Sequence, residues 1–167
     1  MTAADQKVDR RRYQLVPRCL VFALRDQEVL LIKGAANKRL WAGLINGVGG
    51  HIERGEDVLS AARREFREET GLPLLKPRLC GVVLIDTGEA AGIGLFVVRG
   101  ETVADPPRTS VEGELSWYRV DESFYHLPTV EDLPDLLPRV LAHRSGDPPF
   151  SALYQYDEAG KLQISWG

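Results

Sequence analysis

The chain has 167 residues, a formal net charge of -3 at pH 7 and an apolar fraction of 44%. This length suits one domain, and the composition is that of a soluble globular protein, which excludes a disordered chain and an integral membrane protein. Because the chain has no basic excess, we expect small-molecule partners and no nucleic-acid polymer.

The cysteines and the N-terminal apolar stretch indicate the cellular compartment of the protein. Cys19 and Cys80 lie far apart and lack metal-binding spacing, which predicts reduced, buried thiols. The apolar stretch from Cys19 to Leu24 is too short for a signal peptide core or a membrane span. We therefore expect a cytoplasmic protein without a membrane partner. We also expect a flexible N-terminal segment over residues 1–12 and a single domain over residues 13–167.

Apolar stretches alternate with turn residues and predict strands, two helices and a C-terminal hairpin. In chain order these are strands Leu15 to Leu24 and Glu28 to Ile32, a helix from Asp57 to Thr70, strands Leu79 to Asp86, Ile93 to Val98 and Leu115 to Val120, a helix from Leu133 to His143, and hairpin strands Ser151 to Tyr156 and Leu162 to Trp166. The segment from Gly47 to Gly50 is interpreted as a Gly-rich turn. This order predicts one α/β unit.

Carboxylates crowd the first predicted helix. Glu65, Glu68 and Glu69 stand at i, i+3 and i+4 and share one face. Helical phase puts Glu65 and Glu69 within or beside the apolar stripe, and Glu68 at its edge next to Arg64. Acids turned inward repel one another unless a cation neutralises them, and an oxygen-only ligand set favours Mg²⁺ or Mn²⁺ over zinc. The alternative is a solvated helix with surface pairs such as that of Arg64 with Glu68.

The segment from Gly50 to Leu72 resembles the Nudix box: Gly, five residues, Glu, seven residues, then Arg-Glu-apolar-any-Glu-Glu-any-Gly-apolar. Its fixed places are filled by Gly50, Glu56, Arg64, Glu65, Phe66, Glu68, Glu69, Gly71 and Leu72. The resemblance implies a MutT-like Nudix hydrolase with an α/β/α sandwich around a central mixed β-sheet. Phe66 is bulkier than the usual aliphatic residue, and we expect that departure to affect packing rather than catalysis.

The resemblance also implies roles for individual residues. Metal ligands would be Glu65, Glu68, Glu69, the carbonyl of Gly49 and a later acid, for which Glu112 is the first choice and Glu114 the second. One of the three helix glutamates would be the base for the attacking water, and Glu56 and Arg64 would orient the cluster. Substrate phosphates would meet Lys33 and the backbone at Gly50. Exposed loop acids and a solvated strand-end lysine are the alternatives.

The substrate is indicated by Asn46 in the sequence INGVGG, which resembles the corresponding turn of the branch that acts on oxidised purine triphosphates. There an Asn contacts the base, whereas a turn-forming Asn is the alternative. Markers of other branches are missing, which favours a nucleoside di- or triphosphate derivative. The remaining alternatives are an ADP-ribose or dinucleoside polyphosphate hydrolase and a non-enzymatic Nudix ligand sensor. The sequence does not determine whether the protein is a monomer or a homodimer.

Overall fold

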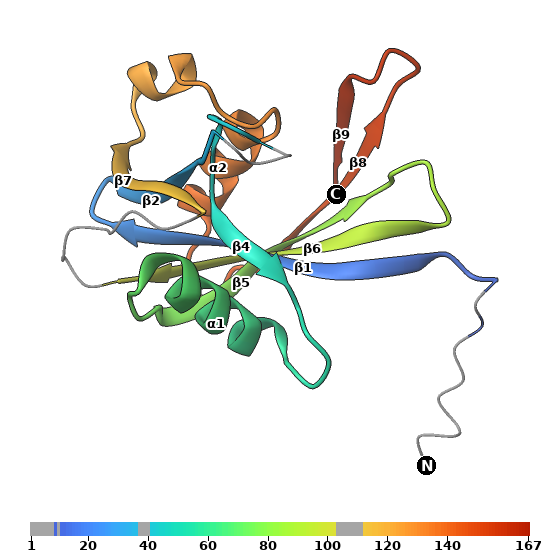
Figure 1. Ribbon diagram of the computed structural model, residues 1–167, viewed down its shortest axis with the longest axis horizontal. Helices are drawn as coiled ribbons and strands as arrows, with labels where there is room; N and C mark the ends of the chain where they lie inside the picture. The colour runs from blue at the N-terminus through green and yellow to red at the C-terminus, as the bar shows by residue number, and fades with distance from the viewer. Residues whose placement is uncertain (1–8, 10, 37–40, 103–111) are drawn as a thin grey trace.

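The computed structural model describes residues 9, 11–36, 41–102 and 112–167. Within these residues one mixed sheet runs through the molecule (Figure 1). Helix α1 (Val58–Thr70) packs against one face of the sheet and helix α2 (Leu133–Ala142) against the other. This arrangement confirms the predicted α/β/α sandwich.

The strands pair in an order that mixes parallel and antiparallel neighbours. Their bounds are β1 (Gln14–Arg25), β2 (Glu28–Gly34), β3 (Ile45–Asn46), β4 (Val48–His51), β5 (Leu75–Ile85), β6 (Ala91–Glu101), β7 (Gly113–Arg119), β8 (Phe150–Tyr156) and β9 (Leu162–Trp166). The order across the sheet is β3-β2-β1-β6-β5-β8-β9, with β4 also paired to β1 and β7 to β2. The pairs β1 with β6 and β5 with β8 are parallel, and the other pairs are antiparallel.

Strand β1 lies at the centre of the sheet, and its side chains alternate between two apolar layers. Cys19, Val21 and Ala23 join the layer that includes Phe66 of α1. Leu20 and Phe22 join the layer formed with the apolar face of α2, which consists of Leu133, Leu136, Leu137 and Val140. Because side chains of a strand alternate in direction, a strand covered on both faces has an almost continuous apolar sequence. This explains the uninterrupted stretch that predicted the strand.

The ends of the helices follow from capping residues. Asp57 is the N-cap of α1, where its carboxylate accepts from the amides of Leu59 and Ser60 at 2.9 and 3.1 Å. Gly71 ends the helix in the left-handed region, with φ of 71°. The predicted first helix is therefore confirmed. Helix α2 and the C-terminal hairpin of β8 and β9 are likewise where the sequence predicted them.

The prediction of a simple turn over Gly47 to Gly50 was wrong. Residues Val48–His51 form β4, in which Gly49 pairs with Leu20 and Gly50 pairs with Cys19 of β1. Glycine has a low propensity for strands, so nothing local indicated this element. Pairing with the buried strand β1 imposes the extended conformation. The short helix η2 (Glu122–His126) was also not predicted.

The predicted flexible segment over residues 1–12 lies, apart from residues 9, 11 and 12, outside the described residues. In the part of the chain that is described, no helix combines the length and the apolar character needed to cross a bilayer.

Candidate functional site

Two glycines allow β4 to lie tightly between β1 and α1. A Cβ on Gly49 would overlap the carbonyl of Cys19 in β1. A Cβ on Gly50 would lie 2.5 Å from the carboxylate atoms of Glu65 in α1. We expected these glycines to bring the backbone close to a ligand. The structure shows that their missing side chains first make room for other groups of the protein itself.

Arg64 lies at the centre of a charged cluster. We call this cluster, which consists of Arg64, Glu56, Glu65, Glu68 and the carbonyl of His51, the Arg64 hub. The Nε and Nη2 atoms of Arg64 donate to the two carboxylate oxygens of Glu56 at 2.6 and 2.8 Å, and Nη2 also donates to the carbonyl of His51 at 3.0 Å. Its Nη1 atom donates to Glu65 at 2.9 Å and to Glu68 at 3.2 Å. The two-pronged contact with Glu56 fixes the plane of the guanidinium, because both parallel hydrogen bonds must be kept. Arg64 thereby connects the loop after β4 to two acids of α1.

The charge state of this hub is set by the same contacts. The Arg64 guanidinium, helped by the Glu53 amide, lowers the pKa of Glu56 to about 2. Hydrogen bonds from Arg64 to Glu56, and then to Glu65, raise the pKa of Arg64 above its ordinary value. Both partners are therefore ionised near neutral pH.

The three helix acids differ in exposure. The Glu65 side chain is 15% exposed and that of Glu68 is 60% exposed, while Glu69 is partly buried. The phase argument thus placed Glu65 inward and Glu68 at the edge, as the structure has them. Arg64 offsets part of the repulsion among these acids, but its single positive charge faces three carboxylates, those of Glu56, Glu65 and Glu68, so a net negative charge remains. Among the described residues, no three acidic, His or Cys side chains are gathered as a metal site would require.

A second group of predicted residues meets at one end of β2. Lys33 pairs across the sheet with Glu114 of β7 on one side and with Ile45 of β3 on the other. Glu112 precedes β7, and its carbonyl accepts from the amide of Ala35 at 3.1 Å. Glu112 is partly buried whereas Glu114 is exposed. Glu114 therefore lies directly opposite Lys33, and Glu112 lies two residues further along, against Ala35.

Asn46 connects the two groups. It lies in β3 opposite Ile32 of β2, and only Gly47 separates it from β4. Its side-chain oxygen accepts from the Gly47 amide at 2.7 Å, which is the contact of an Asn that shapes its own turn. Asn46 thus links the strand that pairs with β2 to β4, the strand that packs against α1.

Sequence reasoning missed the main-chain members of the site. The carbonyl of His51 and the amide of Glu53 hold Arg64 and Glu56 in place. Backbone groups have no residue-specific signal, so no pattern could have identified them. Asp57 could have been recognised as an N-cap, since an acid directly before an apolar periodic stretch is typical of that position.

A shallow cleft of about 540 Å³ adjoins the hub on the solvent side of α1. It is lined by Arg63, Arg64, Arg67 and Glu68. Three guanidinium groups around one acid give a lining suited to an anion. A larger cleft lies elsewhere, on the α2 face of the sheet, and shares no residue with this one.

The chain is similar in sequence and in fold to known proteins. The family model described as NUDIX domain matches residues 14–140. An oxidized purine nucleoside triphosphate hydrolase of Danio rerio is 31% identical over 104 residues, which are 62% of this chain and 65% of that protein, so the match spans slightly less than two thirds of the relative. The hydrolase of the same name from Mus musculus is 29% identical over 117 residues, covering 70% and 71%. A MutT protein from Bacillus halodurans shares the fold with a TM-score of 0.72 at 25% identity, covering 91% of this chain and 97% of that one.

Proposed function

Since the chain belongs to the NUDIX domain family, we propose that it uses water and a divalent metal to cut the diphosphate linkage of a nucleoside di- or triphosphate derivative. Enzymes of this kind are pyrophosphohydrolases acting on phosphorus-containing anhydrides. The observation that carries the proposal is the Arg64 hub. It holds Glu56 and Glu65 together with Glu68, so that box residues far apart in sequence form one charged cluster.

We assign each residue of the site a role in this reaction. Glu56 and the His51 carbonyl hold the guanidinium of Arg64, which in turn fixes the carboxylate of Glu65. One of the helix acids, Glu65, Glu68 or Glu69, takes the proton from the attacking water. Lys33 and the backbone at Gly50 hold the substrate phosphates. The rigid placement of the acids by Arg64 favours catalysis, because small displacements of a catalytic group slow a reaction strongly.

The donor atoms fit a hard cation. Glu65, Glu68, Glu69, the Gly49 carbonyl and the later acid Glu112 offer only oxygen, which suits Mg²⁺ and, as an alternative, Mn²⁺. When bound, the metal would reduce the negative charge on the diphosphate oxygens and lower the pKa of the attacking water. Glu65 and Glu68 would then exchange part of their contact with Arg64 for the metal.

We propose an oxidised purine nucleoside triphosphate as the substrate. Two relatives carry that activity in their names. Asn46 stands at the position that the sequence resemblance associates with the base, and its side-chain oxygen accepts from the Gly47 amide at 2.7 Å. ADP-ribose, dinucleoside polyphosphates and a ligand-sensing role without catalysis are the alternatives.

A substrate panel tests the proposal. Purified protein is incubated with oxidised and unoxidised purine triphosphates, ADP-ribose and dinucleoside polyphosphates, in Mg²⁺, in Mn²⁺ and in chelator, and product phosphate is measured. We expect metal-dependent cleavage, fastest with an oxidised purine. Folded protein that cleaves none of these compounds would support the sensor alternative, and a preference for ADP-ribose would refute the substrate assignment alone.

A pair of variants tests the site. Glu69→Gln removes a candidate ligand or base and is expected to lower turnover by at least about 100-fold, because general-base catalysis contributes on this scale. Glu158→Gln removes one acid from the exposed turn between β8 and β9 and serves as the charge-matched control. Near-normal metal-dependent turnover of folded Glu69→Gln would exclude this residue from the site.

We further propose that residues 13–167 form one domain that works in the cytoplasm as a monomer or homodimer. The continuous sheet from β1 to β9 supports the single domain. Two free, buried thiols, Cys19 and Cys80, support a reducing compartment. Light scattering coupled to size exclusion distinguishes monomer from dimer.

A further inference from the structure

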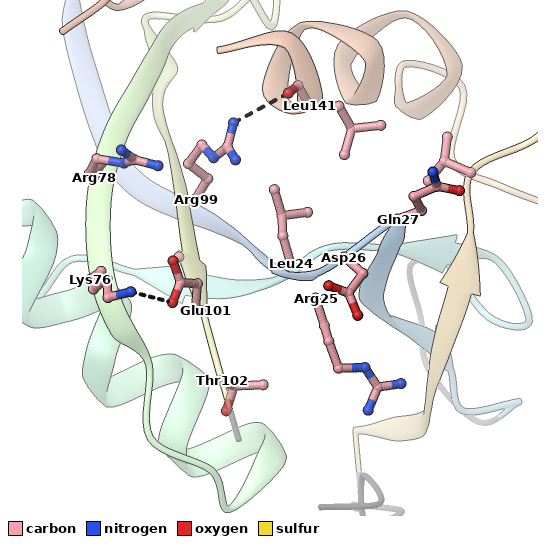
Figure 2. Close-up of a pocket in the computed structure, with 12 residues that line it drawn as sticks. Leu24, Arg25, Asp26, Gln27, Lys76, Arg78, Arg99, Glu101, Thr102 and Leu141 are labelled. Carbon is pink, nitrogen blue, oxygen red and sulfur yellow. Dashed lines mark hydrogen bonds and ion pairs between the residues drawn. The ribbon is translucent and has the colours of Figure 1, made fainter. Parts of the chain in front are cut away.

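A cleft of about 830 Å³ lies on the α2 face of the sheet, and this volume falls within the range of small-molecule binding pockets. It opens between the turn that joins β1 to β2, the paired ends of β5 and β6, and the end of α2 (Figure 2). Leu24 and Leu141 form an apolar wall that continues into the layer around α2. None of its lining residues belongs to the Arg64 hub or to the group around Lys33.

Two arginines dominate one side of this cleft. Arg78 of β5 and Arg99 of β6 are directly opposite each other in the strand register. Figure 2 shows the Arg78 side chain reaching from β5 toward that of Arg99. The Nη1 atom of Arg99 donates to the carbonyls of Val140 at 2.9 Å and of His143, which fixes this guanidinium against the end of α2.

Some of the cations that line the cleft are paired with carboxylates, and others are not. Lys76 pairs with Glu101 at 2.8 Å, and Arg25 pairs with Glu28 at 2.6 Å. In the described part of the chain, neither Arg78 nor Arg99 forms an ion pair with a carboxylate, and the buried Nε atom of Arg78 has no hydrogen-bond partner there. Burial, and next the charge of Arg78, lowers the pKa of Arg99. Two like charges this close repel each other, and the nearby Glu101, which already pairs with Lys76, offsets only part of that repulsion.

We propose that Arg78 and Arg99 form a binding site for the phosphate group of a small molecule, separate from the proposed catalytic site. Guanidinium groups match the oxygens of a phosphate with paired hydrogen bonds. The anchored Arg99 presents a fixed donor. The apolar wall of Leu24 and Leu141 accommodates a less polar body attached to the phosphate.

Orthophosphate is the simplest probe. It is titrated into the full chain in the presence of chelator, so that metal-dependent binding at the proposed catalytic site is suppressed, and amide chemical shifts are followed by NMR. We expect shifts at Gly100 and Leu141, which line the cleft, and none at Gly49 or Gly50. Shifts confined to Gly49 and Gly50, or no shifts, would overturn the proposal while leaving the proposed catalytic function untouched.

A matched pair of variants supplies an independent measurement. Arg78→Gln is expected to weaken orthophosphate binding by at least about tenfold, the effect of losing one charge-assisted hydrogen bond. Lys161→Gln removes one positive charge from the exposed turn between β8 and β9 and is expected to bind as the wild type does. Equal affinities of the two variants would refute the role of Arg78. Arg99 is left unchanged because its substitution would also disturb the end of α2.

Two further probes identify the ligand chemistry. Acetate tests whether a carboxylate suffices, and binding equal to that of orthophosphate would contradict the phosphate assignment. A nucleoside monophosphate distinguishes the sources of the phosphate group. Tighter binding than orthophosphate supports a nucleotide that contacts Leu24 and Leu141, whereas equal binding supports free phosphate as the ligand.

Discussion

Substituting Gly50 by alanine tests whether the position of the Glu65 carboxylate matters for catalysis. The added Cβ would lie 2.5 Å from the carboxylate atoms of Glu65, whereas ordinary contact begins at 3.4 Å. The carboxylate must therefore move by roughly 0.9 Å, and a catalytic group displaced by about 1 Å can cost on the order of 100-fold in rate. That factor corresponds to about 2.7 kcal/mol of activation free energy.

The stability of Gly50→Ala should change much less than its activity. The atoms that must give way are the far end of one side chain rather than backbone. Alanine in a strand also gains roughly 0.5–1 kcal/mol over glycine from its smaller backbone entropy loss, which offsets part of the crowding. We therefore expect a folded protein whose thermal unfolding lies close to that of the wild type.

The assay compares turnover, metal affinity and thermal unfolding of Gly50→Ala with those of Gly94→Ala. Gly94 lies in β6, where an added Cβ would lie 3.6 Å from Leu15, an ordinary contact. The control therefore carries the same chemical change without the collision. If folded Gly50→Ala had the turnover number of Gly94→Ala, the idea that Glu65 must be held in place would be wrong.

Three further predictions concern the hub and the thiols. The pKa of Glu56 is lowered from 4.5 to about 2, so its ionised form stabilises the fold above pH 4.5, and this contribution is lost as the pH falls toward 2. The free energy of unfolding of Glu56→Gln should therefore depend less on pH between these two values than that of the wild type. Arg64→Lys keeps the charge but loses the two-pronged contact, so we expect a large fall in turnover that added Mg²⁺ does not restore. Burial raises the pKa of Cys19, and that of Cys80 to about 12, so neither thiol should react with an alkylating reagent until the protein is denatured.

Most of the fold was predictable because its elements are locally consistent. The α1 helix has an apolar stripe, an N-cap at Asp57 and a left-handed glycine at Gly71, and each feature alone indicates the same element. The β1 and β2 strands have apolar stretches separated by a short turn, where Asp26 adopts a positive φ of 51°. Strand β4 had no such signal, because its glycines have a low strand propensity and adopt the extended conformation through pairing with β1.

The sequence predicted the side chains of the candidate site and some of their contacts, including the pair of Arg64 with Glu68, but not the main-chain groups or the contact of Arg64 with Glu65. The spacing of Glu65, Glu68 and Glu69 fixed their common face on α1. Helical phase gives the direction of a side chain from the helix axis, but it does not show that Arg64 reaches both the loop before the helix and two acids of the helix. The simultaneous contact of Arg64 with Glu56, Glu65 and Glu68 is therefore a tertiary feature, because it depends on where the loop after β4 places Glu56.

The two edges of the Arg64 guanidinium perform different tasks. Nε and Nη2 face Glu56 and the His51 carbonyl, which belong to the loop and strand before α1. Nη1 faces Glu65 and Glu68, and Glu68 is the more exposed of the two. The first edge can stay bound while the second releases its acids, because the parallel bonds to Glu56 are sufficient to hold the guanidinium plane. A cation that reached Glu65 and Glu68, as we propose, would therefore compete only with Nη1, and the loop that Arg64 anchors would not need to move.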